Sequence, residues 1–131
     1  MASRILHLAV AEEIMKQVNI KDKNRFRLGC ILPDAYNQRS DSHLKMFVCG
    51  NSKKTYDLDK FISLFKNEIN EDELYIGYYL HLIQDLIFRE LVYDKYKYDP
   101  TISGSVQRLH NDYHLTNLYA IKNMEYQMMY I

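Results

Sequence analysis

Apolar residues recur at helical spacing in four segments of the chain. These segments, residues 3–18, 56–69, 71–93 and about 105–131, are predicted to be helices. Ser3 is suited to cap the first segment, and acidic residues near the starts of the second and third suit the positive end of a helix dipole. The pattern therefore predicts an all-α fold, a helical bundle of four to five helices.

Two of the predicted helices differ in how much of their surface is apolar. Residues 56–69 are amphipathic. The predicted buried face of this segment consists of Phe61, Leu64, Phe65 and Ile69. Residues 71–93 are apolar on most sides, as is typical of a helix that other elements surround. Gly77 in this segment fits either a close contact between helices or a small residue that is merely tolerated.

One stretch, HLKMFVCGNSKKTYDL at residues 43–58, has the two-residue period of β-strands. Its alternating apolar residues are followed by CGNSKK, a sequence that favours a turn, so one small β-hairpin is predicted. Upstream of it, residues 19–25 are predicted to form a polar loop. The apolar run that follows ends at Pro33, which stops a helix there, so Asp34 is expected at the mouth of a loop.

The composition indicates a single domain, residues 1–131, with no charge bias. Lys plus Arg equals Asp plus Glu at 17 each, so no overall field favours nucleic acid or an anionic membrane. No apolar run approaches the roughly 18 residues of a membrane span, and the short N-terminal run leads into two acidic residues rather than a cleavage site. We therefore expect a cytoplasmic protein with no membrane anchor and no nucleic-acid-binding signature.

The two cysteines, Cys30 and Cys49, do not form a CxxC pair or a disulfide framework. The prediction is two semi-buried free thiols, and one disulfide between them is the alternative.

His81 and Asp85 stand out because they lie four residues apart in an apolar stretch. That spacing places both side chains on one face of a helix, where they could bind one metal ion or each other. Taken alone, such a pair is more often an internal ion pair. The case for a metal site over an ion pair is stronger because His7, Asp34 and His43 also lie within or beside apolar segments. Three imidazoles and two carboxylates suit zinc, with iron or manganese as alternatives.

The five residues occur in the ordered motifs SRILHLAVAEEI, FRLGCILPDAY, SHL and YYLHLIQDLIFREL. In this order the motifs resemble the bacterial zinc-dependent phospholipase C family, and more closely its short members without a signal peptide, the phospholipase C-like hydrolases. The resemblance covers residues 3–93 and, more loosely, the C-terminal helix. It implies an all-α bundle of the phospholipase C and single-strand nuclease type, with a metal cluster at the bottom of a cleft.

The resemblance also implies a role for each of the five residues. One zinc ion would be held by Asp34, His43, His81 and Asp85. Asp85 would bridge to a second ion that His7 helps to bind, and Asp34 would be catalytic by accepting a proton from the attacking water. The expected activity is hydrolysis of a small phosphoester by metal-activated water. The substrate could be a phospholipid head group, a nucleotide or another phosphodiester.

His110 and His114 are weaker metal candidates. They lie four residues apart in the last predicted helix and match only loosely the family's later His-xxx-Glu pair. A polar, half-exposed helix face is the simpler explanation for them. The family's further histidine after HxxxD has no counterpart in FRELVYDKY, so one or two metal ions are expected rather than three.

Two other hypotheses remain beside the hydrolase. One is a degenerate family member that keeps the bundle and a structural metal but serves as a binding or interaction module. The other is an HD-type phosphohydrolase, which is disfavoured because no His-Asp dipeptide occurs in the chain. The sequence leaves the oligomeric state open.

Overall fold

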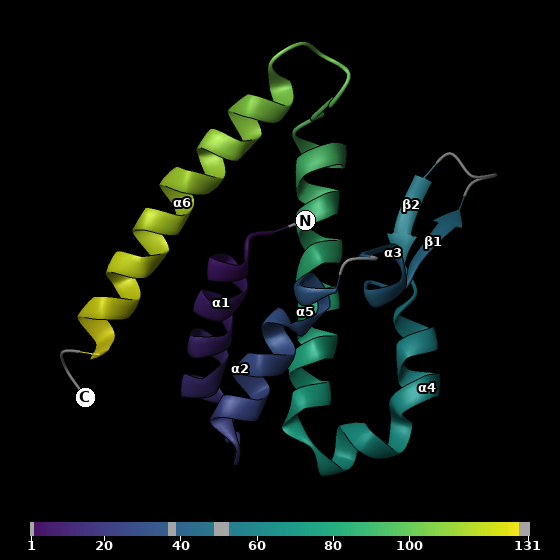
Figure 1. The fold of residues 1–131 in the computed structure, drawn as a ribbon, viewed down its shortest axis with the longest axis vertical. Coiled ribbons are helices and arrows are strands. Elements are labelled where there is room, and N and C mark those ends of the chain that lie inside the picture. The colour runs from purple at the N-terminus through teal and green to yellow at the C-terminus, as the bar shows by residue number, and fades with distance from the viewer. Residues whose placement is uncertain (1, 37–38, 49–52, 129–131) are drawn as a thin grey trace.

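The structure is a computed structural model that describes residues 2–36, 39–48 and 53–128 and is mostly helical. Five long helices make up most of it, together with one small antiparallel hairpin. The long helices are α1 (Arg4–Gln17), α2 (Lys23–Ile31), α4 (Leu58–Glu71), α5 (Glu73–Arg89) and α6 (Ser105–Met128) (Figure 1). The predicted all-α bundle with one small β-hairpin is therefore confirmed.

Short elements connect the long helices between α2 and α4. A 3₁₀-helix, η1 (Leu32–Ala35), continues directly from α2, and a single helical turn, α3 (Arg39–Ser42), follows it. Strand β1 (Lys45–Val48) then pairs antiparallel with β2 (Lys53–Tyr56). The turn predicted for this hairpin, residues 49–52, lies outside the described residues.

Side-chain caps explain where several helices begin. Ser3 Oγ accepts a hydrogen bond from the Leu6 backbone N–H, which confirms its predicted role at the start of α1. Asp22 caps α2 in the same way, so this helix begins at Lys23. The predicted polar loop at residues 19–25 is wrong for its last three residues, because a capped first turn tolerates polar side chains that face solvent.

The central helix is shorter than predicted and is open along part of its surface. Residues 71–93 were expected to be one helix, whereas α5 covers Glu73–Arg89 and a π-helical segment, η2 (Glu90–Lys95), follows. Asp72 caps α5, and its backbone N–H also closes the end of α4. Ile87 is 60% exposed, so other elements surround α5 on only part of its circumference.

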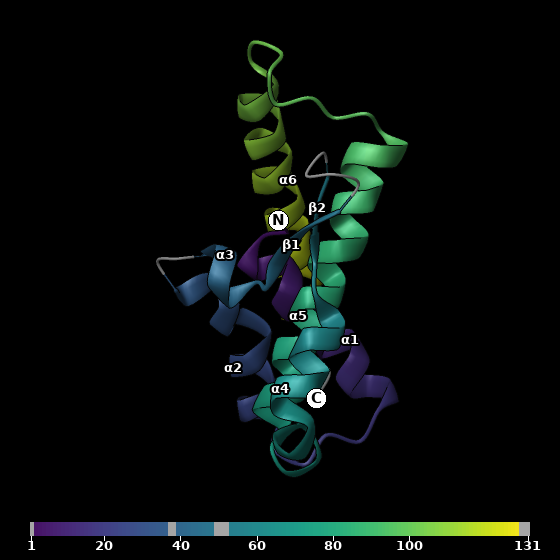
Figure 2. The same cartoon turned by 90° about the vertical axis from the view of Figure 1, so that its right-hand side faces the viewer.

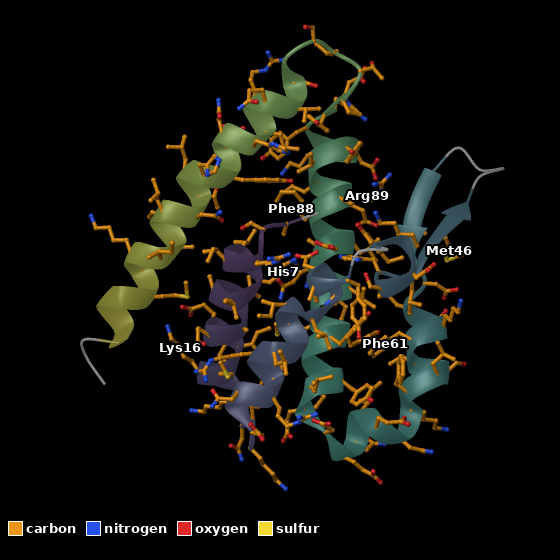
Figure 3. All side chains as sticks on the ribbon, in the orientation of Figure 1. His7, Lys16, Met46, Phe61, Phe88 and Arg89 are labelled. Atoms are coloured by element: carbon orange, nitrogen blue, oxygen red, sulfur yellow. The ribbon has the colours of Figure 1, made fainter. Side chains whose placement is uncertain are left out.

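The other helices lie around α5. Figures 1 and 2 show α4 and the hairpin on one side of α5 and α1 on the other, while α2 crosses α5 and α6 packs on α1. Figure 3 shows His7 pointing from α1 toward α5, and Phe61 pointing toward α5 from α4. In the described ranges, no helix is both long enough and apolar enough to cross a membrane.

The crossing of α2 and α5 is unusually close because two glycines meet there. A Cβ atom on Gly77 would lie 2.2 Å from the Phe26 carbonyl oxygen, and one on Gly29 would lie 2.0 Å from the Leu74 carbonyl oxygen. No side chain fits in either place. Of the two explanations open for Gly77, the structure supports the close contact.

The predicted buried face of α4 is only partly correct. Phe61 is fully buried against Tyr78 and Tyr79, and Phe65 packs on Phe61. Leu64, by contrast, is 54% exposed. The buried stripe follows the four-residue step from Phe61 to Phe65, which leaves Leu64 on the solvent side of the helix.

Candidate metal centre

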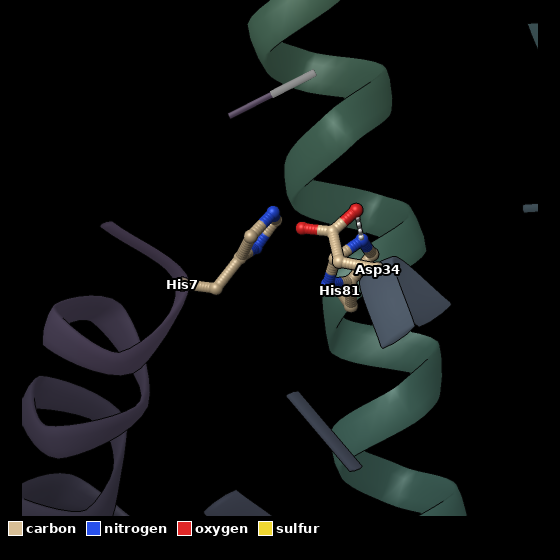
Figure 4. A group of neighbouring side chains, drawn as sticks. All are labelled: His7, Asp34 and His81. Carbon is tan, nitrogen blue, oxygen red and sulfur yellow. Dashed lines mark ion pairs between the residues drawn. The ribbon is translucent and has the colours of Figure 1, made fainter. Parts of the chain in front are cut away.

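Five polar side chains from four parts of the chain converge beside the middle of α5. They are His7 on α1, Asp34 in η1, His43 between α3 and β1, and His81 and Asp85 on α5. All five are buried, with exposed fractions between 0% and 6%. Figure 4 shows three of them, His7 pointing across from α1 to Asp34 and His81. The structure therefore brings together all five residues that were the strongest candidates from the sequence.

Asp85 lies between the three imidazoles. Its Oδ1 atom is 3.3 Å from Nε2 of His7. Its Oδ2 atom is 3.3 Å from Nε2 of His43 and 3.4 Å from Nε2 of His81. One carboxylate oxygen thus faces the histidine on α1, and the other faces the remaining two histidines. This is the arrangement that a bridging carboxylate needs.

Asp34 approaches the same imidazoles from η1. Its Oδ1 atom lies 3.2 Å from Nε2 of His43 and 3.8 Å from Nε2 of His81. Among the described residues, two groups have ligand atoms within 4.8 Å of one another, namely His7, Asp34 and His81, and His43, His81 and Asp85. His81 belongs to both groups, so the geometry can accommodate one cation or two neighbouring ones.

The outer nitrogens of two of the imidazoles are held by hydrogen-bond acceptors. His81 Nδ1 is 2.7 Å from the Cys30 carbonyl oxygen on α2. His7 Nδ1 is 2.7 Å from Oε1 of Gln84 on α5. Since a carbonyl oxygen can only accept, both Nδ1 atoms carry the proton.

The outer nitrogen of His43 is fixed by Ser42. The Ser42 hydroxyl donates its hydrogen to the Pro33 carbonyl oxygen at 2.8 Å, so its contact with His43 Nδ1 at 3.0 Å is an accepted bond. His43 Nδ1 is therefore also a donor. Hydrogen bonds of this kind on the outer nitrogen typically accompany metal-ligating histidines, because they fix the tautomer and orient the ring.

The inner nitrogens consequently present lone pairs to one another and to the carboxylates. A neutral imidazole protonated at Nδ1 has an unprotonated Nε2. His43 Nε2 and His81 Nε2 lie 3.1 Å apart, and His7 Nε2 makes no hydrogen bond within the described part of the chain. Lone pairs and carboxylate oxygens at such distances repel each other unless a proton or a metal cation lies between them. The donor set therefore fits a metal ion with nitrogen and oxygen ligands.

The electrostatics of the cluster favour positive charge at its centre. Burial would raise the pKa of Asp85, but the neighbouring imidazoles of His43, His7 and His81 outweigh burial and hold that pKa well below its usual range. Burial alone would lower the pKa of His43. The carboxylates of Asp34 and Asp85 outweigh burial, so the pKa of His43 is raised above its usual value. Both shifts show that the cluster favours a carboxylate at Asp85 with positive charge beside it, supplied by a proton on His43 or by a metal cation.

The backbone around His43 is held in place by a strained residue and by a tyrosine. Leu44 has a positive φ of 49°, which a branched residue adopts only at a cost of about 1–3 kcal/mol. Leu44 lies where the chain passes from α3 to β1, directly after the buried His43. Tyr78, one turn before His81 on α5, donates its hydroxyl hydrogen to the Ser42 carbonyl oxygen. The Tyr78 hydroxyl is therefore tied to the backbone that carries His43.

Some sequence candidates lie elsewhere. His110 and His114 are exposed on α6 and belong to neither group of potential ligands among the described residues. Cys30 is buried with a free thiol, and burial raises the pKa of this thiol to about 12. Cys30 contributes to the cluster through its carbonyl oxygen. Cys49, the partner in the alternative disulfide, lies outside the described residues.

The sequence prediction missed the residues that hold the imidazoles. Gln84 directly precedes Asp85 and Ser42 directly precedes His43, so adjacency to a candidate ligand was the available signal. Arg4 was missed as well, and its guanidinium donates to the Asp34 carbonyl oxygen at 2.8 Å. These contacts join distant parts of the chain, which a periodic pattern does not show.

Comparisons with known proteins do not identify a relative. No family model, no curated protein and no solved structure matches the chain. The resemblance to the phospholipase C-like hydrolases therefore stays a prediction, and the function must be inferred from the geometry of the cluster.

Proposed function

We propose that this protein is a metal-dependent phosphoester hydrolase whose metal is held by the buried cluster. The proposed ligands are His7, Asp34, His43, His81 and Asp85. The observation that carries the proposal is the fixed orientation of the three imidazoles, whose outer nitrogens are hydrogen-bonded while their Nε2 atoms converge on two carboxylates. The sequence resemblance to the zinc-dependent phospholipase C family supports the same class of activity.

Zinc is the metal that best suits this donor set, with iron or manganese as alternatives. Imidazole nitrogens and carboxylate oxygens are ordinary zinc ligands, and no described thiol reaches the cluster with its sulfur. Because the two oxygens of Asp85 face different histidines, the cluster supports one ion or two ions bridged by Asp85.

The chain's own residues account for the proton transfer and for water exclusion. A bound divalent cation lowers the pKa of a water molecule and neutralises charge on a phosphate oxygen. Asp34 would accept the proton that this water loses as its oxygen bonds to phosphorus. The bond from phosphorus to the leaving oxygen would then break, and the proton held by Asp34 would pass to the leaving oxygen. The burial of His81 and Asp85 keeps bulk water away from the centre.

A second candidate is a non-catalytic module with a structural metal. The observation in its favour is the depth of the cluster, since no member is more than 6% exposed. Structural zinc sites are closed, whereas catalytic sites keep a position open for water or substrate.

Metal analysis and a hydrolysis screen distinguish the two candidates. The protein, purified without chelator, should hold about one or two metal ions per chain, and His81→Ala and Asp85→Ala should lose most of this metal. The hydrolase should cleave at least one compound in a screen of phosphomonoesters and phosphodiesters, and both variants should be inactive. Full metal content without hydrolysis would favour the structural site. Wild-type protein without metal would contradict both candidates.

A further inference from the structure

Arg4 lies at the edge of the cluster, held by the residue that is proposed to accept the proton. Its Nη2 atom donates to the Asp34 carbonyl oxygen at 2.8 Å, while the Asp34 carboxylate faces His43 and His81. The guanidinium is thus bound to the backbone of a residue whose own carboxylate is a proposed metal ligand. The Arg4 side chain is nevertheless exposed.

The charge of Arg4 has no carboxylate partner within the described residues, unlike that of two arginines on α2. Arg25 forms an ion pair with Asp72 at 2.7 Å, and Arg27 forms one with Glu12 at 2.5 Å. For Arg4, the bond to the Asp34 carbonyl oxygen is the one side-chain hydrogen bond found in the described ranges, and no ion pair is found there. A guanidinium has five N–H donors, so most of those on Arg4 remain for a ligand.

Arg4 lies on the side of the cluster formed by Asp34. The side chains of Asp34 and His43 are 4% and 3% exposed, whereas those of His7, His81 and Asp85 are 0% exposed. Because Arg4 is hydrogen-bonded to the Asp34 backbone, a substrate that reached the cluster beside Asp34 would pass the guanidinium of Arg4.

From these observations we infer that Arg4 binds the terminal phosphate of a phosphomonoester at this site, which makes Arg4 a specificity-determining residue. The inference rests on the proposed function and narrows its substrate class. A guanidinium binds phosphate best with two parallel N–H···O bonds. Two oxygens for Arg4 and at least one for the metal require three non-bridging oxygens. A phosphomonoester has three such oxygens and carries two negative charges, whereas a phosphodiester has two oxygens and one charge.

Inorganic phosphate is the probe for this inference, because its binding can be measured without turnover. We would titrate phosphate into zinc-loaded wild-type protein and into Arg4→Gln and Arg4→Lys, using calorimetry. Arg108→Gln, which alters an exposed arginine on α6, is the matched control. Zinc content and far-UV circular dichroism verify that each variant is folded and loaded.

Arg4→Gln should weaken phosphate binding on the order of 10- to 100-fold with unchanged zinc content, since it removes charge-assisted hydrogen bonds. Arg4→Lys should lose less because it keeps the charge without the planar fork. Arg108→Gln should match the wild type. In hydrolysis, Arg4→Gln should raise KM for para-nitrophenyl phosphate more than for bis(para-nitrophenyl) phosphate.

Three results would overturn the inference while leaving the hydrolase proposal intact. The first is wild-type phosphate affinity in Arg4→Gln, and the second is equal wild-type affinity for dimethyl phosphate and inorganic phosphate. The third is wild-type protein that holds zinc but binds no phosphate. If the wild-type protein holds no zinc and binds no phosphate, both proposals fail together.

Discussion

Replacing Gly77 with alanine tests whether the close crossing of α2 and α5 positions the proposed metal centre. The added Cβ would lie 2.2 Å from the Phe26 carbonyl oxygen, whereas carbon–oxygen contacts normally are about 3.3 Å or longer. Because the obstacle is backbone rather than a flexible side chain, α2 must move by about 1 Å. This displacement should lower the free energy of unfolding and disturb the hydrogen bond that orients His81.

Two opposing contributions set the expected stability change. Overpacking a tight contact costs about 1–3 kcal/mol, occasionally more, and a backbone obstacle places Gly77→Ala at the upper end. Replacing glycine by alanine inside a helix stabilises the helix by about 1 kcal/mol. We therefore expect a net loss of about 2 kcal/mol in the free energy of unfolding.

The effect on metal binding follows from the position of Cys30 on α2. The Cys30 carbonyl oxygen is 2.7 Å from His81 Nδ1, and a shift of about 1 Å in α2 would take this contact beyond hydrogen-bonding distance. Loss of such a contact typically lowers metal affinity about 10- to 100-fold. Gly77→Ala should show a loss of this size in a competition titration with a zinc chelator.

Urea unfolding followed by circular dichroism provides the stability assay. Ser63→Ala on the exposed face of α4 is the control, because it introduces alanine into a helix without a steric obstacle. If Gly77→Ala were as stable as the wild type and bound zinc equally well, the close crossing and its link to His81 would both be refuted.

Three further predictions concern single contacts of the fold and the cluster. Gln84→Leu removes the acceptor that orients the imidazole on α1, so zinc affinity should fall about 10- to 100-fold in a competition titration while the fold is kept. Asp72 has a pKa lowered to about 2 by its hydrogen bond with Arg25, below its ordinary value of 3.8. The ionised Asp72 carboxylate should therefore contribute its full stabilisation above pH 3.8 and lose it as the pH falls through about 2. In a circular dichroism titration with acid, Asp72→Asn should lack the unfolding that protonation of Asp72 causes in the wild type. The double variant His110→Ala, His114→Ala should keep the wild-type zinc content in elemental analysis, since both histidines are exposed on α6, and a loss of zinc would place a ligand there.

Much of the helical framework could be predicted because its determinants are local. The cap at Ser3 and the periodic patterns of the first and last helices depend on residues a few positions apart. The exposure of Leu64 could not be predicted, since it depends on which face of α4 packs against the tyrosines of α5. The continuation of α5 as η2 also has no clear local signal.

The candidate site was predictable as a set of residues but not as a geometry. His81 and Asp85 share a face because of their spacing, whereas the approach of His7, Asp34 and His43 depends on how α1, η1 and α3 pack on α5. The positive φ that follows His43 arises from tertiary context. Metal binding by these residues stays a prediction.

The position of the cluster also bears on how the protein folds. Among the described residues, the largest fully buried side chains include four polar ones, His7, His43, His81 and Asp85. Apolar side chains of similar volume would usually stabilise an interior at least as well as a buried charged pair. Here the centre of a small bundle is occupied by groups whose facing lone pairs and carboxylates repel each other unless a proton or a metal cation lies between them. A metal ion would bind to ligands that are brought together only in the folded chain, so metal affinity and the stability of the bundle should be linked.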